Sequence, residues 1–133
     1  AILEGSGEIR IKNVKSSENV SIGVSGSGNI FINENQGCEN LSVTIEGSGN
    51  VYLNNNFINL SYLNLKMKGS GSYDGFVSLS PKVDLNMEGS GNCNLFVTKT
   101  LNAQINGSGN VNYKGHPKVI SKIKGSGKVN DKN

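Results

Sequence analysis

The chain has 133 residues, the size of one small domain, and a formal net charge of +3 from 13 basic and 10 acidic residues. Without a basic motif, this charge is too small to indicate a nucleic-acid-binding protein. The sequence contains no run of eighteen apolar residues and no basic start followed by an apolar stretch. We therefore expect no membrane span in this segment, and we expect any signal peptide to lie outside it.

The tripeptide Gly-Ser-Gly occurs seven times, and successive copies begin 21, 21, 22, 20, 18 and 18 residues apart. A period near twenty residues is typical of a solenoid, in which each unit buries its apolar side chains against its neighbours. Glycine supplies backbone angles and close approach that a β-carbon would obstruct. The predicted structural corners are Gly5, Gly7, Gly26, Gly28, Gly47, Gly49, Gly69, Gly71, Gly89, Gly91, Gly107, Gly109, Gly125 and Gly127.

Apolar residues alternate on both sides of each tripeptide, which is the period of a β-strand. Before the corners they are Val20, Ile22 and Val24, then Leu41, Val43 and Ile45, then Leu63, Leu65 and Met67, then Val83, Leu85 and Met87, then Leu101, Ala103 and Ile105, and finally Val119 and Ile123 around Ser121. After the corners they are Ile9 and Ile11, Ile30 and Ile32, Val51 and Leu53, Cys93 and Leu95, and Val111 and Tyr113, with Tyr73 and Gly75 in the fourth unit. One strand therefore enters each corner and another leaves it.

These strands predict an all-β fold, a single-stranded right-handed parallel β-helix (β-solenoid) of about six to seven coils. The coils would stack at about 4.8 Å per layer, and the right hand follows from the preference of parallel crossovers. Coils of this length hold two or three strands, and the sequence does not decide between these numbers. We expect residues 1–133 to form one β-helix domain of a longer secreted or surface protein, with the chain beginning in mid-coil.

The segment Gly107-Ser-Gly-Asn-Val-Asn-Tyr-Lys-Gly-His-Pro-Lys-Val-Ile, followed by Gly125-Ser-Gly-Lys-Val, resembles the C-terminal signature of the head GIN domain of autotransporter adhesins. The earlier Gly-Ser-Gly-Asn corners resemble the repeated motif of that family. The resemblance implies a β-helical adhesion module at the cell surface or in the extracellular space, and it transfers no catalytic residue. Glu8, Ser72 and Lys128 depart from the Asn or Asp that is usual after the corner.

The asparagines that follow four of the corners should stack above one another, and they are Asn29, Asn50, Asn92 and Asn110. Stacked asparagines can hydrogen-bond from amide to amide along such an axis. We interpret them as a structural ladder, and the alternative is a row of amides that binds a ligand.

A charged column, Glu46, Lys68 and Glu88, precedes the corners of three consecutive coils. Opposite charges in adjacent layers favour modest surface ion pairs that help to set the register. The alternative is a catalytic carboxylate pair, Glu46 and Glu88, of a polysaccharide-active enzyme. The chain has one histidine, His116, which we interpret as a turn residue between Gly115 and Pro117 rather than a proton shuttle. We predict no catalytic residue, no metal site and no cofactor.

The two cysteines, Cys38 and Cys93, should lie three layers apart, roughly 14 Å along the axis and beyond the reach of a disulfide. We interpret Cys93 as a small buried hydrophobe, and Cys38 as an exposed thiol or, alternatively, an intermolecular link. Asn-x-Ser sequons begin at Asn19, Asn40, Asn59 and Asn106. They matter only in the secretory pathway of a eukaryote, and the sequence does not show whether they are modified.

Phe31 and Tyr52 occupy the same outward position in adjacent coils, and they are the candidate ligand-binding residues. Sugars stack on exposed aromatic rings, whereas the structural alternative is a cross-layer aromatic pair covered by neighbouring loops. Counting from the corners also places Phe76 opposite Phe96. The residues that follow them, Val77 and Val97, should turn inward and stack within the core.

Lysines crowd the last two coils, at positions 114, 118, 122, 124, 128 and 132. They could touch anionic glycans, or they could block growth of the exposed strand edge. The first coil carries no polar cap, so either residues before Ala1 complete the domain or this face pairs with another chain. We predict a dimer through the N-terminal face, head to tail or two-fold. We expect a non-enzymatic adhesion module for a surface glycan or matrix protein; the alternatives are a structural spacer and, third, a polysaccharide-active enzyme.

Overall fold

The computed structural model describes residues 2–11, 19–33, 39–54 and 60–133, with the backbone alone at residues 77–79. Every regular element in this part of the chain is a strand. The strands are β1 Ile2–Gly5, β2 Glu8–Ile11, β3 Asn19–Gly26, β4 Asn29–Ile32, β5 Asn40–Gly47, β6 Asn50–Leu53, β7 Tyr62–Gly69, β8 Ser72–Gly89, β9 Asn92–Asn106, β10 Asn110–Lys114, β11 Lys118–Lys124 and β12 Lys128–Asp131. Among these residues there is no helix that could span a membrane.

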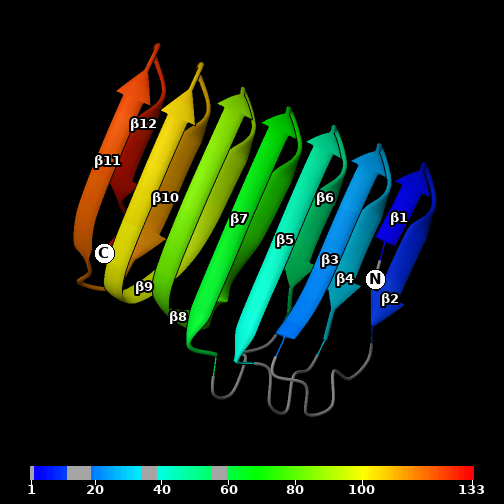
Figure 1. The fold of residues 1–133 in the computed structure, drawn as a ribbon, viewed down its shortest axis with the longest axis horizontal. Coiled ribbons are helices and arrows are strands. Elements are labelled where there is room, and N and C mark those ends of the chain that lie inside the picture. Colours follow the sequence, from blue (N-terminus) through cyan, green and yellow to red (C-terminus); the bar gives the residue numbers. More distant parts are fainter. Residues whose placement is uncertain (1, 12–18, 34–38, 55–59) are drawn as a thin grey trace.

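The strands form the predicted parallel β-solenoid of about six turns. One strand enters each Gly-Ser-Gly corner and the next leaves it, so the inbound strands stack on one side and the outbound strands on the other (Figure 1). We call these two sides the inbound sheet and the outbound sheet. Inbound strands point upward in front, outbound strands point downward behind, and the chain advances from right to left (Figure 1), which makes the coil right-handed.

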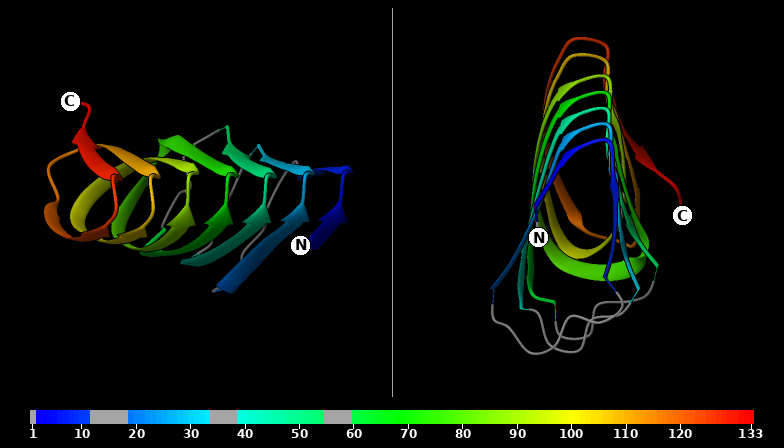
Figure 2. Two further views of the ribbon diagram at one scale, coloured as in Figure 1. Left: turned by 90° about the horizontal axis from the view of Figure 1, so that it is seen from above. Right: turned by 90° about the vertical axis from the view of Figure 1, so that its right-hand side faces the viewer.

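Each coil has two strands at the N-terminal end, whereas β8 and β9 run continuously from the outbound to the inbound sheet. The sequence left the number of strands per coil open, and the structure resolves it in this way. Viewed along the axis, the described coils superpose as a flattened oval with the corner at its narrow edge (Figure 2). All pairings between coils are parallel and in register at the corners.

The corners are held by the backbone rather than by side chains. The carbonyl oxygen of Gly5 accepts hydrogen bonds from Ser27 N and Gly28 N, both at 3.0 Å. The same pair recurs at three further corners, and one bond of the pair is present at the other two. The first glycine of each corner has a positive φ, which is 106° at Gly26 and 110° at Gly69. An alanine there would be strained by its φ and, above the first coil, would also contact the corner below.

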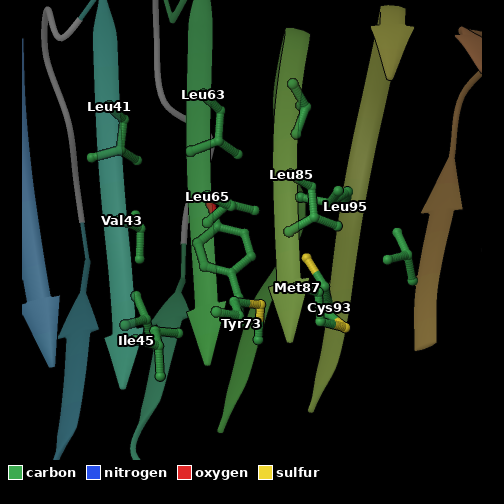
Figure 3. Packing of buried hydrophobic residues seen from close by; sticks show 14 of the residues in the cluster. Leu41, Val43, Ile45, Leu63, Leu65, Tyr73, Leu85, Met87, Cys93 and Leu95 are labelled. Carbon is green, nitrogen blue, oxygen red and sulfur yellow. The ribbon is translucent and has the colours of Figure 1, made fainter. Parts of the chain in front are cut away.

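The apolar positions predicted from the alternation form a continuous core between the two sheets (Figure 3). In the middle coils these side chains are almost fully buried, as Leu63, Leu65 and Ile45 show. At the two ends the core residues are less covered: Leu3 is only partly buried, and Ile123 is 39% exposed. Coverage by both neighbouring coils therefore decides burial, as expected for a solenoid.

One pairing predicted by counting from the corners is wrong. Phe96 lies opposite Leu79 rather than Phe76, because the register shifts between Gly75 and Leu79. The fourth coil is two residues longer than the fifth, and the extra length enters after Gly75. Val97 is fully buried, as predicted. The side chain of Val77 lies outside the described residues. Cys38 also lies outside them.

Tyr73 is the largest fully buried side chain, and its ring points between the sheets (Figure 3). Gly75 makes room for it, because a β-carbon at Gly75 would lie 2.7 Å from Tyr73 Cε1. The Tyr73 hydroxyl has no hydrogen-bond partner among the described residues. Burial raises the pKa of this phenol well above its ordinary value, and nearby Cys93 and Asp74 raise it further. Burial likewise raises the pKa of the Cys93 thiol, so both groups stay neutral.

We expect Tyr73→Phe to raise the free energy of unfolding by about 1 kcal/mol, because a buried hydroxyl without a partner costs about 1–3 kcal/mol. Urea denaturation followed by circular dichroism measures the change. Tyr113→Phe is the control, since Tyr113 is only partly buried, and it should leave stability nearly unchanged. A loss of stability in Tyr73→Phe would show that the hydroxyl makes a favourable contact.

Candidate functional site

The outer face of the outbound sheet carries the candidate ligand-binding residues. Phe31 and Tyr52 lie opposite each other in β4 and β6, as the sequence predicts. The register extends this outward position through every coil. We call the resulting row the Tyr52 column; its members are Arg10, Phe31, Tyr52, Asp74, Asn94, Asn112 and Asn130.

The two aromatic rings stack along the solenoid axis. Their centroids are 5.0 Å apart and their planes differ by 14°. Arg10 lies on the other side of Phe31, with Cζ 4.9 Å from the ring centroid, and its Nε contacts Glu8 Oε1 at 2.5 Å. Both faces of Phe31 are therefore occupied, one by a cation and one by Tyr52. The two rings therefore form a cross-layer aromatic stack.

Tyr52 keeps one ring face toward the next coil, and there the column changes from large to small side chains. Asp74 is the neighbour of Tyr52 in that coil, followed by Asn94 and Asn112. A carboxylate is much shorter than a tyrosine, so the outer part of the Tyr52 ring rises above Asp74 as a step. Asp74 makes no hydrogen bond or ion pair with the described residues.

Amide side chains line the floor beyond this step. Asn112 Nδ2 donates to Asn94 Oδ1 at 3.0 Å, and Asn130 Nδ2 donates to Asn112 Oδ1 at 3.1 Å. This ladder was not predicted from the sequence. Its signal was available, because the three asparagines share the distance from the corner that places Phe31 and Tyr52 in one row.

The predicted asparagine column lies beside the Tyr52 column on the same outer face. Asn50 Nδ2 donates to Asn29 Oδ1 at 3.0 Å, and Ser72 continues the row by donating its backbone N–H to Asn50 Oδ1 at 3.0 Å. Asn92 and Asn110 follow in register. Two further pairs bond in the same way, Asn40 to Asn19 at 3.0 Å and Asn54 to Asn33 at 2.7 Å. The Tyr52 column is thus aromatic in its early coils and rich in amides in its later coils, whereas the neighbouring asparagine column carries amides in both.

The charged column lies on the opposite, inbound face. Glu46, Lys68 and Glu88 are in register in consecutive coils. They do not form the ion pairs expected from their order, because no contact among them reaches 4.0 Å in the described structure, where the ion pair is Arg10–Glu8. The side chains extend into solvent beside an open groove of about 280 Å³. Lys68 separates the two glutamates, and the groove is shallow, so the geometry adds no support for catalysis.

The remaining candidates lie apart from one another. His116 is exposed, next to Gly115 with its positive φ, while Cys93 is fully buried in the core as predicted. Within the described residues, no group of three or more His, Cys, Asp and Glu side chains could hold a metal ion. Of the sequon residues, Asn19 and Asn106 are exposed and Asn40 is partly buried, while Asn59 lies outside the described structure.

A family model described as "Putative auto-transporter adhesin, head GIN domain" matches residues 1–117, most of the chain. The chain belongs to this family. The head GIN domain also resembles a crystal structure of a putative adhesin from Parabacteroides distasonis ATCC 8503. The TM-score is 0.75 at 25% identity, and the match covers 98% of this chain and 57% of that chain. No curated protein sequence matches the chain.

Membership in this family and the structural relative support an adhesion-like role for the head GIN domain, with a location at the cell surface. They point away from an enzyme and do not name a ligand. The chain spans 57% of the length of the relative.

Proposed function

We propose that this head GIN domain is a non-enzymatic adhesion module that binds a surface glycan on the outer face of the outbound sheet. The observation that supports this proposal is the step in the Tyr52 column. Phe31 stacks on one side of the Tyr52 ring, and the next residue of the column is Asp74, whose carboxylate makes no hydrogen bond or ion pair with the described residues. A sugar ring would pack its apolar face against Tyr52 and lie over Asp74 and Asn94.

The chemistry of the step matches the two kinds of surface that a sugar presents. The C–H groups of a pyranose ring make apolar contact with an aromatic face. Its hydroxyl groups donate to a carboxylate and both donate to and accept from amides. Asp74 and Asn94 are partly buried in adjacent coils, about 4.8 Å apart. This spacing suits neighbouring hydroxyl groups of one sugar residue.

Arg10 and Phe31 have a supporting part in this proposal. Because Phe31 lies between Arg10 and Tyr52, it cannot offer a ring face to a ligand. It packs against one side of the Tyr52 ring instead. The sugar contact is therefore assigned to one side of Tyr52, which refines the expectation that both aromatic residues bind the ligand.

We expect a glycan array probed with the purified domain to show saturable binding, and Tyr52→Ala to weaken it at least about tenfold. A tenfold loss corresponds to about 1.4 kcal/mol, the order of one aromatic contact. Asp74→Ala should weaken binding as well, because it removes a hydrogen-bond acceptor. Titration calorimetry with the strongest glycan of the array measures each affinity.

Two control variants make this experiment specific. Lys66→Ala changes an exposed residue of the inbound sheet and should leave the affinity unchanged. Phe31→Leu keeps an apolar support under Tyr52 and should weaken binding less than Tyr52→Ala does. Equal losses in Phe31→Leu and Tyr52→Ala would contradict the one-sided contact, and an effect of Lys66→Ala would move the site to the other face.

A purely structural spacer is the second candidate function. The parallel pairing that continues from the first coil to the last favours it, because such a stack makes a rigid rod without any ligand. Absence of binding to every glycan and matrix protein tested would favour the spacer over the adhesion module.

A further inference from the structure

The outer face of the outbound sheet carries two further aromatic residues beside the Tyr52 column. Phe76 follows Asp74 by two residues in β8, and Phe96 follows Asn94 by two residues in β9. Because successive side chains of a strand alternate between its faces, both rings share the outer face with the column. Each of them is partly buried. The face that holds the proposed sugar site therefore continues along the strands beyond Asp74 and Asn94.

Lys114 extends across these two aromatic residues from the coil that follows Phe96. It lies opposite Phe96 in the register of β10 and β9, yet its Nζ lies 4.8 Å from the centroid of the Phe76 ring, one coil farther back. The side chain therefore reaches over the layer of Phe96 to that of Phe76. The negative face of an aromatic ring attracts a cation, which holds the ammonium group at this place.

The ammonium group of Lys114 has no counter-ion among the described residues. Two carboxylates belong to neighbouring positions, Asp74 two residues before the aromatic ring and Asp131 in the next coil. Neither comes within 4.0 Å of Lys114, since the ion pair of the described structure is Arg10–Glu8. Lys114 is also exposed, so an anion from solution can reach its ammonium group.

This ammonium group lies within reach of a glycan bound at the step in the Tyr52 column. Phe76 stands one coil from Tyr52 and two residues farther along the strand, a backbone separation of about 8 Å. This separation exceeds the width of one pyranose ring and suits the next residue of a chain. A glycan with one residue packed on Tyr52 can therefore place a neighbouring residue beside Lys114.

We propose that the glycan bound by this domain is acidic, with a carboxylate or sulfate group held by Lys114 and a neutral residue packed on Tyr52. This assignment rests on the proposed adhesion function and names the class of its ligand. Asp74 sets the order of the two residues, because its like charge repels an anionic sugar from the step. Phe76 is a positioning residue, which orients the ammonium group.

The glycan array tests the ligand class directly. It should include oligosaccharides of hyaluronan, in which a carboxylate-bearing residue alternates with a neutral one, and of keratan sulfate, in which sulfated residues alternate with galactose. Their carboxyl-reduced and desulfated forms serve as neutral counterparts. The strongest binding should go to glycans in which an acidic residue adjoins a neutral one.

Titration calorimetry with the strongest acidic glycan of the array tests the part of Lys114. Lys114→Gln should weaken binding about five- to tenfold, because a neutral hydrogen bond replaces a charge-assisted one. Lys122→Gln is the matched control, since it removes the same charge from an exposed position of β11 on the inbound sheet and should leave the affinity unchanged. Circular dichroism verifies that each variant is folded.

Chemical changes to the glycan identify the anionic group. Carboxyl reduction should weaken binding to the unchanged domain if Lys114 holds a carboxylate, and desulfation should do so if it holds a sulfate. Neither change should add to the loss in Lys114→Gln, because protein and glycan changes then remove the same contact. Raising the salt from about 0.1 M to about 1 M should also weaken the unchanged domain more than this variant, since the Debye length falls from about 10 Å to about 3 Å.

Phe76→Leu tests the positioning of the ammonium group. It keeps an apolar side chain but removes the ring, so binding of the acidic glycan should weaken while the affinity for its neutral form stays unchanged. A merely structural role would lower both affinities alike.

A neutral glycan as the strongest ligand overturns the proposal. So does an acidic glycan that Lys114→Gln binds as tightly as the unchanged domain does. If Tyr52→Ala still weakens binding in either case, the adhesion module stands and only its ligand class is wrong. Absence of binding to every glycan, by contrast, contradicts the proposed function and the acidic ligand together.

Discussion

Replacing Gly71 with alanine is expected to lower the free energy of unfolding by about 3–5 kcal/mol, in the range of the most damaging single substitutions. The new β-carbon would lie 2.2 Å from the carbonyl oxygen of Gly49 and 2.7 Å from Ile45 Cγ2. The Gly49 oxygen belongs to the backbone ladder and accepts from Ser72 N at 3.3 Å. Relief of the clash therefore requires two coils to separate. Urea denaturation gives the change.

The first coil supplies a matched control for this substitution. Gly7 occupies the same place in its corner, but a β-carbon there would approach only Leu3 Cδ1, at 3.5 Å, an ordinary contact. Gly7→Ala should change stability by less than about 1 kcal/mol. A comparable loss in both variants would show that the stacked corner is not the cause.

Replacing Leu65 with alanine is expected to cost about 2–5 kcal/mol of the free energy of unfolding. Leu65 is completely buried in β7, between the inbound strands on either side of it and the outbound sheet. The side chains around it are fixed by backbone pairing to both neighbouring coils, so they cannot move in to fill the cavity. Thermal and urea denaturation of the variant measure the loss.

Two other substitutions separate burial from position in this test. Lys66→Ala changes the next residue of the same strand, which is exposed, and should stay within about 0.5 kcal/mol of the unchanged chain. Leu3→Ala removes the same atoms from the partly buried end of the core and should cost less than Leu65→Ala. If Leu3→Ala lowered the free energy of unfolding more than Leu65→Ala, the contribution of a core residue to stability would not depend on coverage by coils on both sides.

Most of this fold could be predicted from the sequence because the repeat carries its own register. Gly-Ser-Gly marks one corner of every coil, so any two residues at the same distance from it share a column. This rule placed Phe31 opposite Tyr52 and Glu46 opposite Lys68, as the structure confirms. It also predicted which residues face the core, because alternation is strict next to the corners.

The same rule failed where the path away from the corner changes length. Phe76 and Phe96 stand five residues beyond their glycines, but the extra residues after Gly75 shift their register. A count from one fixed point cannot locate an insertion. The positions of the side chains within a column also could not be predicted from the sequence. The column that contains Phe31 and Tyr52 was identified, whereas the position of Arg10 over Phe31, which covers one ring face, depends on rotamers.

The orientation of the backbone hydrogen bonds determines how this molecule responds to mechanical load. The strands lie across the solenoid axis, so the bonds between coils run along it, and the two ends of the chain lie at opposite ends of the stack (Figure 1). A pull through those ends acts along the bonds instead of shearing a whole strand at once. The outer coil then detaches one bond at a time, and the next coil follows. A surface module built in this way lengthens under tension in small steps, each releasing about twenty residues of chain, while the coils still stacked keep their shape.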